Sequence, residues 1–359
     1  MNEIALHSKI KDYYVHYETN FDFMNKLRDV QPRVIIVDRK VFDLYTDIFK
    51  TSFDSDEFIL FDAIESNKTI ESCMILYEKI INKAFKKNMT IISAGGGITQ
   101  DVTGFVASTL YRGVKWIYLP TTFLAQTDSC IGSKTSLNFK SYKNLVGTFF
   151  PPDHIYINPR FINTLTDLDF YSGIGEAIKL QLMKEDSPKD IKDIRAVIEK
   201  ATLKEAAYLT ELIRDNMNIK ISYMENDEFD QGRRNLLNYG HCFGHALETA
   251  SRYHVPHGIA VLIGILFAAI LSHARHMLSA EYLHSIFTEL VAPNIRLKLD
   301  QDYFDDKLIL TSMKKDKKKI GKLLTVIIPD KDLNIVKIDD VTDQEVYNCV
   351  IEIKCYLFT

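Results

Sequence analysis

The sequence predicts an α/β domain with a doubly wound, mostly parallel sheet at residues 1–165, followed by an all-helical domain at residues 166–359. Short β-branched runs alternate with helical stretches in the first half of the chain. The Pro151-Pro152 step and the segment Phe161–Leu165 then mark a change, after which the pattern is nearly all helical. A chain of 359 residues is long enough for two domains that each have a core.

The strands of the first domain are predicted from short apolar runs. The clearest helix between these runs is Lys68–Lys87. Strands and helices in alternation are typical of a parallel sheet, whose ligands bind at the carboxyl ends of the strands. The residues that follow each strand are therefore candidates for a binding site. In chain order the predicted strands are Val34–Val37, Phe58–Phe61, Thr90–Ser93, Trp116–Leu119 and Ile155–Ile157.

The composition is that of an ordinary globular protein, with 46% hydrophobic and 26% charged residues. The net charge of −4 gives no bulk support for binding nucleic acid or an anionic membrane. Five scattered cysteines form no CxxC pair, which favours a reducing compartment without disulfides. The amino terminus has no apolar signal core, and the apolar run Ile259–Leu271 is too short to span a bilayer. We expect this run to be a buried core helix and the protein to be cytoplasmic.

Three predicted strands are followed by groups that suit a nucleotide. Asp38 follows the first strand and could bind a ribose, although a carboxylate in this place is more often a helix cap. Gly95–Gly97 follows the third strand, where backbone N–H groups could approach a pyrophosphate. The spacing is not GxGxxG, and a flexible turn with Asp101 as N-cap is the alternative. Thr121 and Thr122 follow the fourth strand at the same edge of the sheet.

The run from Asp128 to Asn144 is polar and has little periodicity. Its residues Lys134, Lys143 and Asn144 would suit a phosphate or a carboxylate. The alternative is a solvated loop, which is the usual setting for lysines.

The stretch Gly232–His257 combines polar and apolar residues in a way that indicates a buried site. If Arg234 to Thr249 is one helix, then Arg234, Asn238, His241 and His245 fall at i, i+4, i+7 and i+11, on or near one face. Apolar side chains fill much of the remaining surface, so the polar face needs partners. These partners could be a metal, a ligand or structural neighbours. His257 follows at a Val-Pro-His-Gly turn and could supply a third imidazole.

Other charged residues in the second half have two interpretations. Glu176 and Lys179 lie at i, i+3 beside an apolar face. They could form an ordinary exposed ion pair or a buried functional pair. Lys220 lies in a further predicted helix. The lysine-rich run 314–319 is by default a solvated loop.

Taken in order along the chain, these signals resemble the 3-dehydroquinate synthase family of sugar phosphate cyclases. The resemblance runs from about residue 30 to residue 325. It implies an amino-terminal NAD-binding α/β domain, a carboxy-terminal helical domain that binds metal and substrate, and a homodimer. The matching segments are GGGITQDVTGF, YRG, PTTFLAQTDS, GSKTSLN, KNLVGTF, SGIGEAIK, GRRNLLNYGHCFGHALE and HG.

The resemblance also implies roles for individual residues. A divalent metal, zinc or cobalt, would be bound by Glu176, His241 and His257. Arg112 would reach the substrate in the neighbouring subunit. NAD would be held by Asp38, Glu65, Lys68, Gly95, Gly96, Gly97, Asp101, Thr121, Thr122, Lys143, Phe161 and Thr164, with Asp128 and Lys134 beside it. The substrate would be held by Asp128, Lys134, Asn144, Lys179, Lys220, Arg234, Asn238, His245 and Lys317.

The implied activity is that of 3-dehydroquinate synthase, a carbon–oxygen lyase of the shikimate pathway that leads to aromatic amino acids. It converts 3-deoxy-D-arabino-heptulosonate 7-phosphate, a phosphorylated sugar acid, to 3-dehydroquinate and phosphate. NAD takes up and returns a hydride, which permits phosphate elimination before an intramolecular aldol closure. The metal favours the alkoxide of a bound hydroxyl, as zinc lowers the pKa of bound water to about 7. Arg234, Lys220 and Asn238 resemble the family's grip on the substrate carboxylate, and His245 would relay protons.

Three departures from the family pattern leave other activities open. Ile259 stands where a glutamate usually follows the HG pair, Ser133 replaces a common glycine, and Asp230 stands where glutamate is more usual. One alternative is a related cyclase that acts on another substrate, such as sedoheptulose 7-phosphate. The others are a metal- and NAD-dependent polyol dehydrogenase and a non-catalytic scaffold.

Overall fold

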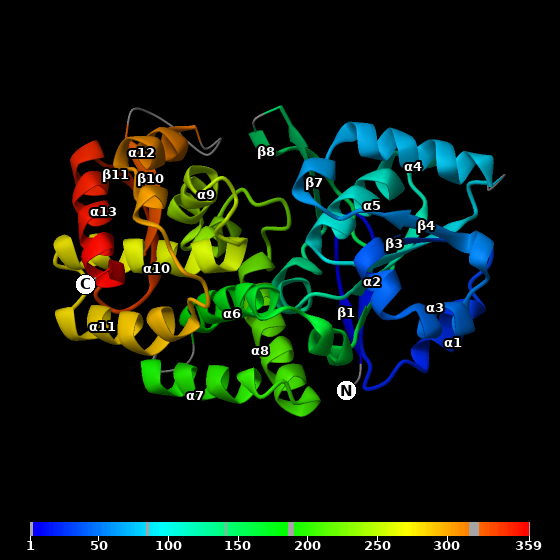
Figure 1. Ribbon diagram of the computed structural model, residues 1–359, viewed down its shortest axis with the longest axis horizontal. Helices are drawn as coiled ribbons and strands as arrows, with labels where there is room; N and C mark the ends of the chain where they lie inside the picture. Colours follow the sequence, from blue (N-terminus) through cyan, green and yellow to red (C-terminus); the bar gives the residue numbers. More distant parts are fainter. Residues whose placement is uncertain (1–2, 84–85, 141, 186–189, 316–322, 359) are drawn as a thin grey trace. The chain divides into compact units, whose positions relative to one another are not determined.

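A seven-stranded sheet forms the centre of the first domain, which spans Met1–Leu165 (Figure 1). The computed structural model describes residues 3–83, 86–140, 142–185, 190–315 and 323–358. The strand order is β1-β2-β9-β6-β5-β3-β4; β1 and β2 pair antiparallel and the other neighbours pair parallel. The predicted α/β class with a mostly parallel sheet is therefore confirmed. The strands are β1 (Glu3–Leu6), β2 (Tyr13–Tyr17), β3 (Arg33–Asp38), β4 (Phe58–Phe61), β5 (Thr90–Gly95), β6 (Lys115–Pro120) and β9 (His154–Ile157).

Helices cover both faces of this sheet, because its central strands are apolar on both sides. One face packs against the aromatic cluster of α1 (Phe23–Arg28), α2 (Arg39–Leu44) and α3 (Thr46–Ser52). On the other face, Trp116 of β6 meets Gly104 of α5 (Gly97–Thr109), where a Cβ atom would be crowded. Helix α4 (Ile70–Asn82) packs on α5 and lies inside the predicted helical segment.

The polar run after residue 128 folds as a hairpin and not as a solvated loop. Strands β7 (Lys134–Phe139) and β8 (Tyr142–Phe149) pair antiparallel, with Lys134 opposite Phe149. Ser133, just before β7, has a positive φ of 65°. This left-handed backbone is easiest for glycine, so serine adopts it here at some cost.

The second domain, Thr166–Thr359, is helical and is built around α10 (His257–Ala274). Residues 258–272 of α10 are all buried, and α6, α9, α11, α13 and β10 pack against it. Length and composition alone would let α10 cross a membrane, yet most of the helix is buried inside the domain. The prediction of a buried core helix at Ile259–Leu271 is confirmed.

The remaining elements complete the second domain. The hairpin of β10 and β11 is the one departure from an all-helical domain among the described residues, and its sequence is strand-like. The helices are α6 (Asp167–Leu182), α7 (Ile191–Thr202), α8 (Ala206–Met224), η6 (Arg233–Asn238), α9 (His241–Ala250), α11 (Ala280–Ser285), η7 (Ile286–Val291), η8 (Ala292–Asn294), η9 (Gln301–Phe304), α12 (Asp306–Lys314) and α13 (Asp343–Phe358), and the strands are β10 (Leu324–Pro329) and β11 (Ile335–Val341).

Glycines let α10 approach its neighbours backbone to backbone. A Cβ atom on Gly258 would overlap the carbonyl oxygen of Ser172 in α6, and one on Gly175 would overlap the carbonyl oxygen of Gly258. The Gly258 N–H donates to the Ser172 hydroxyl at 3.0 Å. Further along α10, Gly264 lies against Gly240 in the same manner. These contacts fix the start of α10 against α6 and the start of α9 against the middle of α10.

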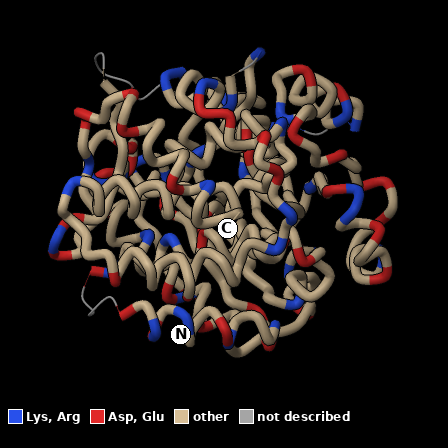
Figure 2. Tube along the Cα trace, turned by 60° about the vertical axis from the view of Figure 1, so that its left-hand side comes forward, with Lys and Arg blue, Asp and Glu red and all other residues tan. Residues whose placement is uncertain are grey.

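Acidic and basic residues are mixed along the described part of both domains (Figure 2). This mixture agrees with the net charge of −4.

Two histidines form a half-buried pair on neighbouring strands of the first domain. The His16 Nε2 lies 3.0 Å from His154 Nδ1, and the His16 Nδ1 lies 3.1 Å from the Glu3 carboxylate. Burial lowers the pKa of His16, and the nearby His154 adds to this effect. Burial also lowers the pKa of His154, although the carboxylates of Asp153 and Glu3 oppose it.

We expect the first domain to lose stability as the pH falls below about 6.5, the ordinary pKa of histidine. The unfolded chain takes up protons there, whereas the folded pair stays neutral to lower pH, so protonation favours unfolding. The fluorescence of Trp116, the single tryptophan and a buried residue of β6, reports on this domain. Urea unfolding at pH 7.5 and pH 5.5 should show a smaller pH effect in His16→Gln than in the wild type. An equal effect in both proteins would contradict the assignment to this pair.

We expect Gly258→Ala to destabilise the second domain by about 1–3 kcal/mol, since the added methyl forces α6 and α10 apart. Circular dichroism during thermal unfolding measures this loss. The control is Ala274→Gly, which changes one methyl at the other, exposed end of α10 and should cost no more than about 1 kcal/mol. Equal stability of Gly258→Ala and the wild type would disprove the close contact.

Candidate metal and substrate site

The candidate site of the second domain is carried by four elements, of which α6 and α9 both pack on α10. Glu176 and Lys179 lie on α6, Arg234 and Asn238 on η6, His241 and His245 on α9, and His257 begins α10. Residues Arg234 to Thr249 do not form the single helix that the spacing argument assumed. Segment η6 ends at Asn238, and Gly240 adopts a left-handed φ of 76° before α9 begins. The close contact of Gly240 with Gly264 holds this break, which separates Arg234 and Asn238 from the histidine face.

Glu176 is the centre of the cluster, with a side chain that is 1% exposed. Its Oε1 lies 3.0 Å from His257 Nε2 and 3.4 Å from His241 Nε2, and its Oε2 lies 2.5 Å from Lys179 Nζ. Burial alone would raise the pKa of Glu176, but Lys179 and His241 hold it well below its usual range. The carboxylate is therefore an anion at neutral pH. Despite these short distances, neither oxygen accepts a well-directed hydrogen bond.

Both imidazoles next to Glu176 are oriented through their Nδ1 atoms. The His241 Nδ1 lies 3.0 Å from the carbonyl oxygen of Tyr239, which can only accept, so this nitrogen donates. The His257 Nδ1 lies 3.2 Å from a carboxylate oxygen of Glu248. In each ring the Nε2 atom is thereby directed to Glu176.

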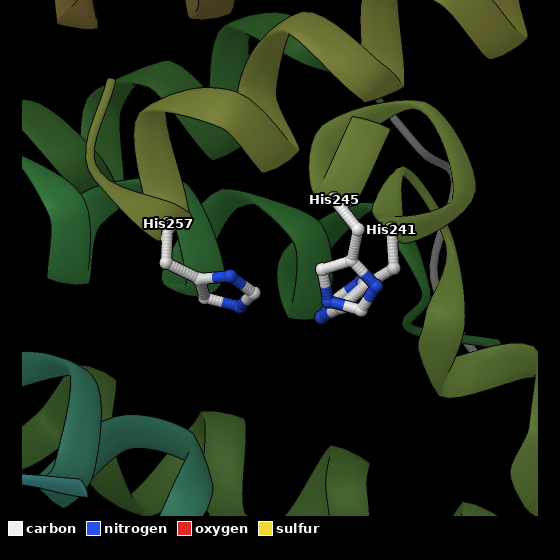
Figure 3. A group of neighbouring side chains, drawn as sticks. All are labelled: His241, His245 and His257. Carbon is white, nitrogen blue, oxygen red and sulfur yellow. The ribbon is translucent and has the colours of Figure 1, made fainter. Parts of the chain in front are cut away.

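The imidazole rings of His241, His245 and His257 point toward one another (Figure 3). One nitrogen of each can be chosen so that all three lie within 4.8 Å of one another. Burial lowers the pKa of His241, against the influence of Glu176. Burial also acts to lower the pKa of His257, but the carboxylates of Glu248 and Glu176 outweigh it and raise the pKa to about 10.

These donors fit a divalent metal. One carboxylate and two imidazoles are a common catalytic zinc set, and a buried carboxylate whose lone pairs accept no good hydrogen bond is a suitable ligand. His245 is close enough to be a further ligand or to lie beside one. The grouping of Glu176 with His241 and His257 therefore has a geometric basis, while the ligand set itself stays a prediction.

Three cations are buried among the described residues of the second domain. Lys179, Lys220 and Arg234 are 1%, 8% and 3% exposed. The loop before η6 is organised by Asp227, whose carboxylate accepts the N–H groups of Gln231, Gly232 and Arg234 at 2.8 Å each. Asn238 is half-buried and donates to the carbonyl oxygen of Asn235. Lys179 is paired with Glu176, and Arg234 donates to the carbonyl oxygen of Glu228. Buried lysine and arginine side chains are also the groups that suit a phosphate or carboxylate ligand.

In the first domain, candidate nucleotide-binding groups meet at the carboxyl edge of the sheet. Asp38 ends β3, which neighbours β5 with Val37 opposite Ala94. The turn Gly95–Gly97 leads from β5 into the amino end of α5, and Gly96 lies against Thr122 beyond β6. Asp38 also accepts from the Lys40 N–H, so it caps α2, as the alternative interpretation held. Thr121 is buried beside the same turn, and its N–H donates to the Gly95 carbonyl oxygen.

A second group in the first domain is assembled by the β7–β8 hairpin. Lys68 Nζ lies 2.5 Å from Asp101 Oδ2 and donates to Asn144 Oδ1 at 2.6 Å. Ser136 of β7 donates to both of these acceptors, and Asn138 donates to Glu65. Lys143 lies 3.6 Å from Glu65. Ser136 and Asn138 were not predicted as site residues from the sequence. The signal that could have found them is their alternation with the buried residues Thr135 and Leu137, which is typical of a strand.

The other predicted site residues of the first domain have varied surroundings. Phe161 is buried in the aromatic core, and Thr164 bonds to the hydroxyl of Tyr45. Asp128 is half-buried in η4 (Ala125–Ser129), whereas Lys134 is exposed at the start of β7. Arg112 is exposed at the amino edge of β6, the opposite edge from the glycine turn. Lys317 lies outside the described residues.

Two family models match adjoining parts of the chain. The 3-dehydroquinate synthase N-terminal family matches residues 58–172, and the 3-dehydroquinate synthase C-terminal family matches residues 173–319. The chain is 32% identical to a 3-dehydroquinate synthase of Clostridium tetani over 354 residues, which are 95% of this chain and 92% of that protein.

Solved structures with similar folds include two sugar phosphate cyclases. One is 2-epi-5-epi-valiolone synthase from Streptomyces hygroscopicus subsp. jinggangensis with NAD+ and Zn2+ bound, with a TM-score of 0.84, 22% identity and 98% of each chain covered. The other is 2-deoxy-scyllo-inosose synthase complexed with carbaglucose-6-phosphate, NAD+ and Co2+, with a TM-score of 0.82, 20% identity and coverage of 98% and 99%. At these identities the similarity shows the fold.

We expect the metal-free protein to bind a single zinc ion through the cluster at His241 and His257. Because the raised pKa of His257 means that a proton must leave before the metal binds, zinc affinity should increase from pH 6 to pH 8. Titration against a zinc-sensitive chelator measures the affinity and the stoichiometry.

The variant for this test is His241→Ala, which should lose tight binding. The matched control is His254→Ala, because His254 is an exposed histidine of the same domain that bonds to the carbonyl oxygen of Ser251. Equal zinc affinity of both variants would rule out the cluster as the binding site.

Proposed function

The chain belongs to the 3-dehydroquinate synthase family, and on this premise we propose that it is a 3-dehydroquinate synthase. It converts 3-deoxy-D-arabino-heptulosonate 7-phosphate to 3-dehydroquinate and phosphate. The observation that carries this proposal is the burial of Lys220 and Arg234 in the domain that also holds the histidine cluster. A phosphorylated sugar acid supplies the anions that such cations favour.

Two cofactors are part of the proposal. NAD would bind in the first domain at the glycine turn, with Asp38 and the group around Lys68 near it. A zinc or cobalt ion would bind in the second domain through Glu176, His241 and His257. When bound, the metal would polarise substrate hydroxyls and NAD would exchange a hydride. Related cyclases of the same fold hold NAD+ with Zn2+ or Co2+.

The chain's own residues supply binding and proton transfer. Arg234 presents a planar guanidinium that suits a carboxylate, and Asp227 fixes the backbone from which this arginine extends. Lys179 compensates the charge of Glu176 from the next turn of α6. His245 lies beside the two imidazoles and would accept or return a proton at a substrate hydroxyl. Lys134, Asn144 and Lys317 would bind the phosphate or other polar groups of the substrate.

Assembly and location follow as further parts of the proposal. Arg112 is exposed on a turn with positive φ values at Tyr111, Arg112 and Gly113. It would reach the substrate of a second copy in a homodimer. The proposed setting is the shikimate pathway of the cytoplasm.

One alternative has a specific observation in its favour. Ile259 is fully buried where the family usually has a glutamate, and synthases for other sugar phosphates share the fold. A cyclase that acts on sedoheptulose 7-phosphate would fit these facts. Its substrate has no carboxylate, so Arg234 would then lack its proposed partner.

The test is incubation of the pure protein with NAD, Zn2+ and the heptulosonate phosphate. We expect phosphate release without accumulation of NADH at 340 nm, because the hydride is returned in each turnover. Arg234→Ala should lower kcat/KM on the order of 100-fold, since removal of one partner of a buried ion pair costs about 3 kcal/mol or more.

The neighbouring Arg233→Ala is the matched control. Arg233 is exposed and pairs with Glu185, so its removal should leave kcat/KM within about threefold. Preference of the wild type for sedoheptulose 7-phosphate, together with normal turnover of the acid by Arg234→Ala, would refute the substrate assignment. Net NADH formation with a polyol would instead indicate a dehydrogenase.

A further inference from the structure

We infer that Glu248 is a positioning residue for the metal site, and that it sets metal affinity through its contact with His257. This inference rests on the proposed function, because that function places a metal at Glu176, His241 and His257. Glu248 itself lies on the far side of the His257 ring from Glu176. It contacts Nδ1 at 3.2 Å, whereas Glu176 lies 3.0 Å from Nε2.

Helix α9 presents three polar groups on one face. His241, His245 and Glu248 lie at i, i+4 and i+7, a spacing that places them along one side of a helix. The same helix therefore carries two imidazoles of the cluster and the carboxylate that holds the third. This arrangement ties the orientation of His257, which lies on α10, to the position of α9.

Burial makes the contact strong. Glu248 is 5% exposed, so its carboxylate has little access to water. A buried anion is costly unless it is paired, and the His257 Nδ1–H is a charge-assisted donor to it. The Glu248 side chain thereby fixes which nitrogen of His257 carries the proton, and it leaves Nε2 as the metal-binding atom.

The start of α10 gives His257 no carboxylate of its own. Gly258 has no side chain, and Ile259 is apolar and fully buried. Within the described part of the chain, the carboxylates in contact with the His257 ring are Glu176 and Glu248. If Glu176 binds the metal, the orientation of His257 depends on Glu248.

The experiment measures the zinc dissociation constant of metal-free protein by competition with a chromophoric chelator. Partners that orient a metal-binding histidine change metal affinity by about 10- to 100-fold. Glu248→Ala removes both the acceptor and the charge, and we expect a loss near the upper end of this range. Glu248→Gln keeps an acceptor for Nδ1–H without the charge, and we expect a loss near the lower end.

The matched control is Glu345→Gln, which is the same substitution at a residue of α13 that contacts the other end of α10. Glu345 pairs with Arg275 just after α10 ends, whereas Glu248 pairs with His257 where α10 begins. The visible spectrum of the Co2+-loaded protein is the second measurement. It should change in both Glu248 variants and stay unchanged in Glu345→Gln, since it reports on the geometry around the ion.

The outcomes separate this inference from the proposed function. If the wild type binds zinc and Glu248→Ala binds it within threefold as tightly with an unchanged Co2+ spectrum, the positioning role is refuted and the metal site stands. If the wild type binds no zinc, both the proposed metal site and the positioning role are refuted. Weaker zinc binding with unchanged thermal stability of the metal-free variants supports the inference, because a merely structural role would lower the stability.

Discussion

The close approach of α6 and α10 is the contact on which the second domain's site depends. Gly175 and Gly258 lack the Cβ atoms that would hold these backbones apart, and Ser172 bonds across the contact. Glu176 directly follows Gly175, and His257 directly precedes Gly258. The backbone contact therefore places a carboxylate beside an imidazole from a distant part of the sequence. Packing between helices, and not local spacing, assembles the cluster.

Charge is distributed so that each buried group of the cluster has a counterpart. Glu176 faces Lys179 on one side and two imidazoles on the other, while Glu248 faces the outer nitrogen of His257. This alternation of anion and cation limits the cost of burial. In the first domain, Lys68 pairs with Asp101 in the same manner. Ser136 and Asn138 of β7 then bond to the carboxylates of Asp101 and Glu65. Both domains thus hold polar groups in place before any ligand is considered.

Local sequence patterns predicted the elements that are buried on both sides. The run Val34–Val37 is apolar throughout, as a central parallel strand must be, and Ile259–Leu271 is as apolar as a core helix requires. The strand Tyr13–Tyr17 escaped notice because its aromatic and histidine residues alternate in burial. The break at Gly240 depends on a contact with Gly264, which helical spacing does not reveal. The partnership of Glu176 with the histidines was implied by the family resemblance. The contact of Glu248 with His257 joins two helices, so the sequence does not reveal it.

The burial of α10 has a consequence for how the polypeptide is made. Part of its surface is covered by β10 and α13, and Ser272 of α10 bonds to the Pro329 carbonyl oxygen of β10. These covering elements follow α10 along the chain and leave the ribosome after it. A nascent polypeptide that ends before β10 therefore exposes part of a long apolar helix to water. Exposed apolar surface of this kind is bound by chaperones or leads to aggregation. Completion of the carboxy-terminal hairpin and helix is what closes the domain.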